Sequence, residues 1–221
     1  MKQHYFVKKK EEHHMNVIMH NGYDALHAIF NHLPEHIIRH SRRVAVLAAV
    51  LAAYVPEEQL PEEIDMKTYH IALSYAGRYH EIGIYLARND IKQRPVMAEK
   101  VLNEYWNMDF APQFNEIVFE AVRGCHERFD GTGYPNKLHG DEIPLSAQLV
   151  GLADMLDDMV HYRSGRFSHG NIARRAMQAA KILEKKEDLF GPKAMACFEQ
   201  VQDEIFALYL NYHWEYEHSF A

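Results

Sequence analysis

The apolar residues of this chain recur at the spacing of α-helices. After Pro34, for example, Ile37, Val44, Leu47 and Leu51 follow one another seven, three or four positions apart. Residues at these intervals share one face of a helix, and no segment sustains the alternation of a β-strand. The same spacing predicts further helices near residues 66–88, 95–107, 113–126, 146–162, 170–186 and 192–213. We therefore expect an all-α fold, built as a bundle of irregularly crossing helices.

The composition restricts the classes of partner and compartment. Lys and Arg number 24 against 31 Asp and Glu, a formal charge of −7, so we expect no binding to DNA. The longest apolar run, residues 44–55, is shorter than the roughly 20 residues that cross a membrane, and the first twenty residues do not resemble a signal peptide. The two cysteines, Cys125 and Cys197, have no paired spacing, which is typical of a reducing compartment. We expect a cytoplasmic protein.

Histidine is frequent in this chain, with 16 residues, and His40 is the first candidate metal ligand. It lies four residues before Val44 and seven before Leu47, so it shares the apolar face of its predicted helix. A buried imidazole needs a partner, and a hydrogen bond within the core is the more common one. The position of His40 alone leaves both a core role and a ligand role open.

His80 and Glu81 form the second candidate element, at the end of an apolar helical segment. His80 lies in line with Leu73 and Gly77 at helical spacing. Neighbouring side chains on a helix point about 100 degrees apart, yet both can reach one cation if the helix ends toward it. This pair by itself is a weak indication of a metal site.

A glycine-rich loop and the helix after it form the third element. Residues 125–144, CHERFDGTGYPNKLHGDEIP, contain three glycines and lack helical or strand periodicity. A loop of this length in a compact helical domain is typically functional or disordered. Asp154 follows on the next predicted helix, with Asp157 and Asp158 three and four positions further on. A solvated acidic face is the simplest interpretation of Asp157 and Asp158.

These residues carry a resemblance to a known family. The stretch HERFDGTGYP, followed by HGDEIPLSAQLVGLAD, resembles the HD-GYP family of the HD phosphohydrolase superfamily, and the upstream pattern HSRRVAVLA is similar as well. Members of this family hydrolyse the bacterial second messenger cyclic di-GMP at a metal centre. The resemblance covers roughly residues 30–200. It implies an HD-domain-like helical domain over residues 30–221, with residues 1–29 as an N-terminal extension that packs on the domain or leads into it.

The resemblance also implies roles for individual residues. The implied metal ligands are His40, His80, Glu81, His126 and Asp154. His126 and Glu81 are in addition the implied catalytic residues. Tyr134, within the Gly-Tyr-Pro element, and the two arginines Arg163 and Arg166 are the implied substrate-binding residues, and a guanidinium suits bidentate contacts with phosphate.

The sequence departs from the family pattern at several of these positions. Glu81 stands where the pair has Asp, Cys125 replaces a histidine, Arg94 replaces another ligand histidine, and Ile84 replaces a lysine. His36 takes the place of a carboxylate that binds an additional metal in some members. Cys125 and His36 are thus candidates for extra ligands, whereas a fixed cation such as Arg94 repels a neighbouring ion. We expect one strongly held divalent transition metal (Fe, Mn or Zn), or two.

Two functions fit this pattern. The first is a metal-dependent phosphodiesterase that hydrolyses cyclic di-GMP or a related nucleotide, in which the metal activates a water molecule and the arginines offset the charge on phosphate. The alternative is a degenerate, catalytically inactive HD-GYP module that binds nucleotide or a protein partner in signalling. A third interpretation, in which every histidine is structural, leaves the long loop without a role. The retained ligand set favours the enzyme.

The sequence suggests few sources of regulation. We expect input from a separate sensory or signalling protein, from self-association into a homodimer, or from metal and redox state through Cys125. The aromatic segment at residues 209–220 is a candidate surface for self-association, although packing back on the bundle is the simpler expectation.

Overall fold

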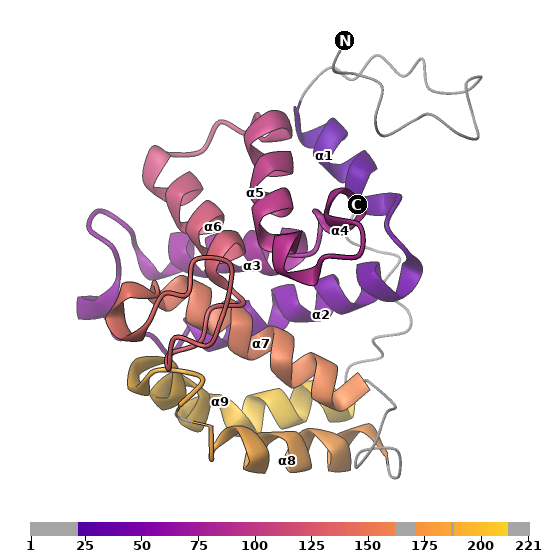
Figure 1. The fold of residues 1–221 in the computed structure, drawn as a ribbon. Helices are drawn as coiled ribbons and strands as arrows, with labels where there is room; N and C mark the ends of the chain where they lie inside the picture. The colour runs from indigo at the N-terminus through magenta and orange to yellow at the C-terminus, as the bar shows by residue number, and fades with distance from the viewer. Residues whose placement is uncertain (1–21, 162–170, 187, 212–221) are drawn as a thin grey trace.

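The computed structural model describes residues 22–161, 171–186 and 188–211 (Figure 1). Within these residues every regular element is helical, which confirms the all-α prediction. The α-helices are α1 (Gly22–Asn31), α2 (Glu35–Ala52), α3 (Met66–Tyr79), α4 (Ile84–Ala87), α5 (Arg94–Tyr105), α6 (Pro112–Gly124), α7 (Leu145–His161), α8 (Ile172–Leu183) and α9 (Pro192–Asn211). Short 3-10 helices lie at Glu57–Gln59, Ile91–Gln93 and Gly140–Glu142.

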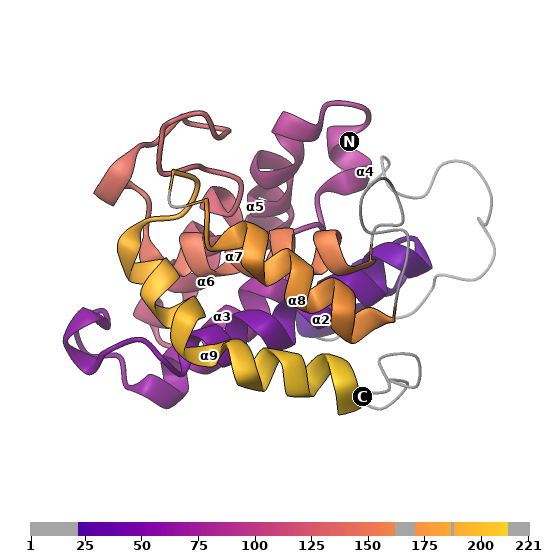
Figure 2. The ribbon, with the colours of Figure 1, turned by 90° about the horizontal axis from the view of Figure 1, so that it is seen from below.

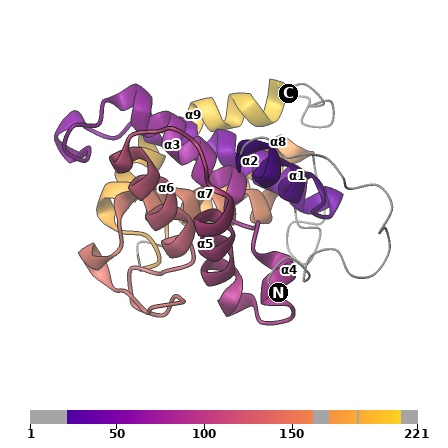
Figure 3. The ribbon, with the colours of Figure 1, turned by 90° about the horizontal axis from the view of Figure 1, so that it is seen from above.

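Helix α7 is the central element of the bundle. It contacts α2, α3, α6, α8 and α9, and most of its residues are buried. Helices α8 and α9 pack together on one side of α7, as the view from below shows (Figure 2). Helices α5 and α6 pack together on the opposite side, which is seen from above (Figure 3). Side chains carried by α7 are therefore enclosed from several directions.

Helices α2 and α3 approach each other closely at Gly77. A Cβ atom at this position would lie 2.7 Å from Cα of Ala45 and 2.9 Å from the carbonyl carbon of Val44. Only glycine permits this approach without movement of one backbone. The crossing brings the first half of α2 beside the last turn of α3, where His40 and His80 lie.

The structure corrects the prediction of one helix over residues 66–88. Helix α3 ends at Tyr79, and residues 80–83 form a turn before the short helix α4. Gly83 packs against the backbone of α5, where a Cβ atom would lie 2.2 Å from the amide nitrogen of Ala98 and 2.6 Å from the carbonyl oxygen of Arg94. This tertiary contact, which helical spacing does not reveal, ends the helix just before His80 and Glu81.

Helix α1 was not predicted, and it spans residue 30. Its Leu26 and Phe30 side chains are fully buried in the same core as α2 and α3, and α1 contacts α5. At the other end of the described chain, Tyr209 on α9 is also buried, whereas residues 212–220 of the aromatic segment lie outside the described residues. None of the helices described here has the length and apolar character needed to span a membrane.

The long loop at residues 125–144 is held in place by hydrogen bonds and close packing within the loop. The buried Glu127 carboxylate accepts hydrogen bonds from the amides of Asn136 (2.6 Å) and Leu138 (3.0 Å). The amide of Tyr134 donates to the carbonyl oxygen of His126 (3.1 Å). Gly133 fits because a Cβ atom there would lie 2.3 Å from the amide nitrogen of Arg128. The loop is therefore a folded element that fixes Tyr134 next to His126.

We predict that Gly77→Ala lowers the free energy of unfolding by about 1–3 kcal/mol, because the added methyl group forces α2 and α3 apart. Ser74→Ala, one turn earlier on α3, is the matched control and should leave stability nearly unchanged. Urea unfolding followed by circular dichroism measures both. Equal stability of the two variants would show that the helices can separate at this crossing without cost.

Candidate metal centre

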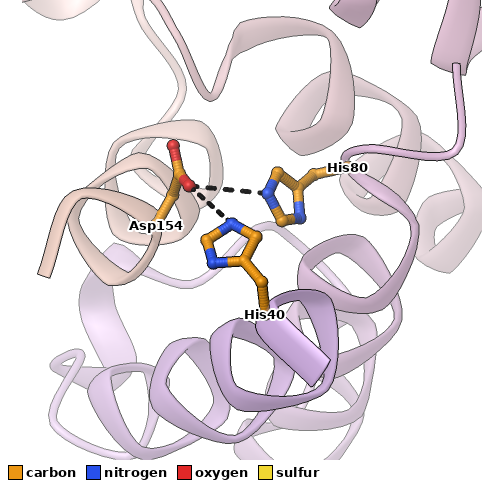
Figure 4. Close-up of side chains that lie close together, drawn as sticks. All are labelled: His40, His80 and Asp154. Atoms are coloured by element: carbon orange, nitrogen blue, oxygen red, sulfur yellow. Dashed lines mark hydrogen bonds and ion pairs between the residues drawn. The ribbon is translucent and has the colours of Figure 1, made fainter. Parts of the chain in front are cut away.

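Three helices bring His40, His80 and Asp154 together (Figure 4). His40 lies on α2, His80 caps the C-terminus of α3, and Asp154 lies on α7. Nε2 of His40 is 3.0 Å from Oδ1 of Asp154, and Nε2 of His80 is 3.6 Å from the same oxygen. All three side chains are buried. The structure thus joins three of the residues that the sequence nominated as ligands.

The donor atoms of these residues have the spacing of a metal site. One donor atom of each residue lies within 4.8 Å of the other two. Two ligand atoms about 2.1 Å from an ion, at angles between 90 and 109 degrees, are about 3.0–3.4 Å apart, close to the observed distances. Nitrogen from histidine and oxygen from carboxylate suit divalent Fe, Mn and Zn. The residues present therefore fit a transition metal.

Backbone geometry fixes the reactive side of His80. Nδ1 of His80 donates a hydrogen bond of 2.7 Å to the carbonyl oxygen of Gly77. This bond places the proton on Nδ1 and leaves Nε2 facing Asp154, the arrangement that metal-binding histidines use. Nε2 is buried and has no hydrogen-bond partner among the described residues. A buried polar atom of this kind requires an explanation, and a metal ion supplies one.

His126 lies on the other side of the Asp154 carboxylate. Its Nδ1 is 3.6 Å from Oδ2 of Asp154, and its Nε2 is likewise buried without a hydrogen-bond partner in the described part of the chain. The ring stacks on Tyr134 with centroids 5.1 Å apart. Burial lowers the pKa of His126, so its imidazole is neutral near pH 7. His126 therefore adjoins the group of His40, His80 and Asp154 as an uncharged donor.

Asp157 anchors His40, which corrects its interpretation as part of a solvated face. The Asp157 side chain has 0% exposure and accepts hydrogen bonds from Nδ1 of His40 (2.8 Å) and from Nε and Nη2 of Arg43 (2.7 and 2.9 Å). Nδ1 of His161 is 2.9 Å from Oδ1 of Asp157, the oxygen that also accepts from Nε of Arg43. Asp158 lies further away, with Oδ1 3.7 Å from Nδ1 of His40, and its side chain is 62% exposed. Asp157 thereby orients Nε2 of His40 toward Asp154.

The electrostatics of the centre follow from these contacts. Burial alone would lower the pKa of His40, but hydrogen bonds to Asp154 and Asp157 outweigh it and raise that pKa well above its usual value. Burial alone would raise the pKa of Asp154, but the neighbouring His40 and His80 hold it well below its usual range. Asp154 is therefore a carboxylate, and a metal ion would replace a proton of His40.

Glu81 and Arg94 form an ion pair at the edge of the centre. Nη1 of Arg94 donates to both carboxylate oxygens of Glu81, at 3.2 and 3.4 Å. Glu81 is buried, and its carboxylate does not belong to the group that His40, His80 and Asp154 form among the described residues. The structure thus brings Glu81 close to the centre, but its carboxylate is paired with the guanidinium of Arg94.

The remaining nominated residues lie further from the group or outside the described chain. Cys125 is buried, its thiol donates to the carbonyl oxygen of Val122, and burial raises its pKa well above the usual value, so it is protonated. His36 is exposed on α2, one turn before His40. Arg163 and Arg166 lie within residues 162–170, outside the described residues.

Sequence reasoning missed the buried partners of the ligands. Arg43 and His161 received no role, although Arg43 is three residues after His40 and His161 is seven after Asp154, so each lies on the same helical face as a ligand. This spacing was the available signal. It does not by itself distinguish a buried ion pair from a solvated one.

The buried cluster of His40, His80 and Asp154, held by three helices of an all-α bundle, is typical of helical proteins that bind a metal ion. The family comparison is more specific: residues 25–194 match the HD domain, and the chain belongs to the HD-domain family. It is 28% identical over 196 residues to a cyclic di-GMP phosphodiesterase of Vibrio cholerae, an alignment that covers 80% of this chain and 38% of the relative.

Two further relatives from Vibrio cholerae match shorter segments. A probable cyclic di-GMP phosphodiesterase is 54% identical over 82 residues, which cover 37% of this chain and 18% of the relative. A 3'3'-cGAMP-specific phosphodiesterase is 32% identical over 93 residues, which cover 42% of this chain and 17% of the relative. The chain therefore spans about two fifths or less of the length of these relatives.

We predict that Asp157→Asn lowers the free energy of unfolding by about 3–5 kcal/mol, because the buried Arg43 loses its counter-charge. Asp203→Asn, at an exposed position on α9, is the control and should change stability by no more than about 0.5 kcal/mol. Urea unfolding in the presence of EDTA removes any contribution of bound metal. If the two variants unfold alike, the Asp157 network does not stabilise the fold.

Proposed function

We propose that this chain is a metal-dependent phosphodiesterase of the HD-GYP type that hydrolyses cyclic di-GMP. The observation that carries the proposal is the meeting of His40, His80 and Asp154, with Nε2 of His80 and of His126 buried and without a hydrogen-bond partner among the described residues. The names of the relatives support the substrate class, because two are cyclic di-GMP phosphodiesterases or probable ones and a third acts on 3'3'-cGAMP. A related cyclic dinucleotide is the alternative substrate.

In this proposal His40, His80 and Asp154 hold one divalent Fe, Mn or Zn ion, with His126 as a fourth ligand or as a proton acceptor. A bound ion of this kind lowers the pKa of water and offsets negative charge on phosphate. The chain's own residues prepare the site. Asp157 holds the ring of His40, and the carbonyl oxygen of Gly77 holds that of His80. Fixed ligands avoid reorganisation during the reaction.

The substrate would lie on the side of the centre that Tyr134 borders. Burial raises the pKa of Tyr134 to about 12, so its phenol remains protonated and can donate a hydrogen bond. Its ring, already stacked on His126, also offers a face for a nucleobase. We further propose that Arg163 and Arg166 bind substrate phosphate, as the resemblance implies.

The alternative function is a binding module without turnover. The Glu81–Arg94 pair favours this alternative, because the carboxylate of the residue directly after His80 is bound to a guanidinium. Such a module would bind a cyclic dinucleotide or a signalling protein and would use the same folded loop.

Cys125 and Cys197, both free and buried, support our further proposal of a cytoplasmic protein. A sensory partner or a homodimer would then supply the regulatory input.

We predict product formation when the chain, loaded anaerobically with Fe²⁺ or Mn²⁺, is incubated with cyclic di-GMP. His80→Ala should lower turnover by at least about 100-fold, since a ligand is lost, while the far-ultraviolet circular dichroism stays helical. Liquid chromatography of the nucleotides measures product, and 3'3'-cGAMP is tested in parallel.

The alternative gives a different result in the same experiment. A metal-loaded chain that binds cyclic di-GMP in equilibrium dialysis but forms no product from either nucleotide is a binding module. Turnover by His80→Ala equal to that of the unaltered chain would reject the assignment of the centre.

A further inference from the structure

We propose that Arg94 takes the place of a second metal ion, so that the centre holds a single ion and the Arg94 guanidinium binds substrate phosphate beside it. The inference rests on the proposed function, because it assigns the phosphate of that substrate to a residue of this chain. It concerns the Glu81–Arg94 pair, whose position so close to the buried ligands calls for an explanation.

Arg94 is in contact with its surroundings at both its guanidinium and its backbone. Its Nη1 reaches both oxygens of Glu81, the residue directly after His80. Its backbone is closely packed as well, because a Cβ atom on Gly83 would lie only 2.6 Å from the carbonyl oxygen of Arg94. The turn that carries His80 and Glu81 is therefore locked to the first residue of α5.

The charges of the centre match one dication better than two. Asp154 faces the three imidazoles of His40, His80 and His126, whereas Asp157 is paired with Arg43 and Glu81 with Arg94. Asp158, which lies 3.7 Å from Nδ1 of His40, is the one further carboxylate near the centre among the described residues. A guanidinium stays charged at every working pH and cannot coordinate a metal. The Arg94 guanidinium therefore pairs with the Glu81 carboxylate, which a second ion would need as a ligand, and its positive charge repels that ion.

Arg94 keeps hydrogen-bonding capacity for an anion. Its Nη1 serves Glu81, while Nε is buried and has no hydrogen-bond partner among the described residues. The Arg94 side chain is 28% exposed, in contrast to 7% for the Glu81 side chain, so Arg94 is the more accessible member of the pair. A guanidinium can bind a carboxylate on one edge and a phosphate on another. Phosphate is the anion that the proposed substrate supplies.

The first test is the number of metal ions in each chain. The chain is loaded with Mn²⁺, freed of unbound ion, and measured by inductively coupled plasma mass spectrometry. We expect one ion in the unaltered chain and two in Arg94→His, in which the cation is replaced by a ligand and Glu81 is released. Arg94→Lys keeps the charge and should hold one ion. Lys100→His, an exposed site on the same helix, is the matched control and should also hold one.

The second test is the affinity for inorganic phosphate. Isothermal titration of the Mn²⁺-loaded chain should show at least about tenfold weaker phosphate binding in Arg94→Met, because a charge-assisted hydrogen bond is lost, and no change in Lys100→Met. Circular dichroism and thermal unfolding establish that each variant is folded. Two ions in the unaltered chain, or equal phosphate affinity in Arg94→Met, would overturn the inference.

Neither test depends on turnover, so the two proposals can fail separately. One ion and Arg94-dependent phosphate binding, without hydrolysis of a cyclic dinucleotide, would support the role of Arg94 and reject the proposed activity. Two ions with active hydrolysis would support the proposed activity and reject the role of Arg94.

Discussion

The contact between α2 and α7 depends on one buried carboxylate, that of Asp157. It accepts hydrogen bonds from Arg43 and His40 of α2, and Nδ1 of His161 on its own helix lies 2.9 Å from it. Removing charges from water is costly, and it is tolerated here because each polar atom of the carboxylate is engaged. This network fixes α2 relative to α7 at the position where His40 faces Asp154. The metal centre and the packing of the central helix thus share one interaction.

The centre joins elements that are far apart in the sequence. His40, His80 and Asp154 come from α2, from the end of α3 and from α7, and their approach requires Gly77 at the crossing of α2 and α3. The loop at residues 125–144 adds His126 and Tyr134 through backbone bonds of its own. Next to His80, the Arg94 guanidinium pairs with the carboxylate of Glu81. The result is a site with one strongly engaged aspartate and a fixed cation beside it.

Much of this arrangement could be predicted from the sequence, for identifiable reasons. Helical spacing located α2, α5, α6, α8 and α9 because each buries an apolar face, and it located α7, most of whose residues are buried. The resemblance nominated His40, His80 and Asp154, which the structure brings together. Spacing failed where tertiary contacts decide the outcome. The end of α3 depends on the fit of Gly83 against α5, and the burial of Asp157 depends on Arg43 across the helix interface. The Glu81–Arg94 pair arises the same way, between residues thirteen positions apart.

The central claim is that His40, His80 and Asp154 bind a metal ion, and anomalous diffraction tests it most directly. Crystals of the Mn²⁺-loaded chain, measured at the manganese absorption edge, should show one strong peak about 2.0–2.3 Å from Nε2 of His40, Nε2 of His80 and a carboxylate oxygen of Asp154. Nδ1 of His40 should remain bonded to Asp157. Peaks confined to surface carboxylates, with His40 still hydrogen-bonded to Asp154 as in Figure 4, would contradict the account.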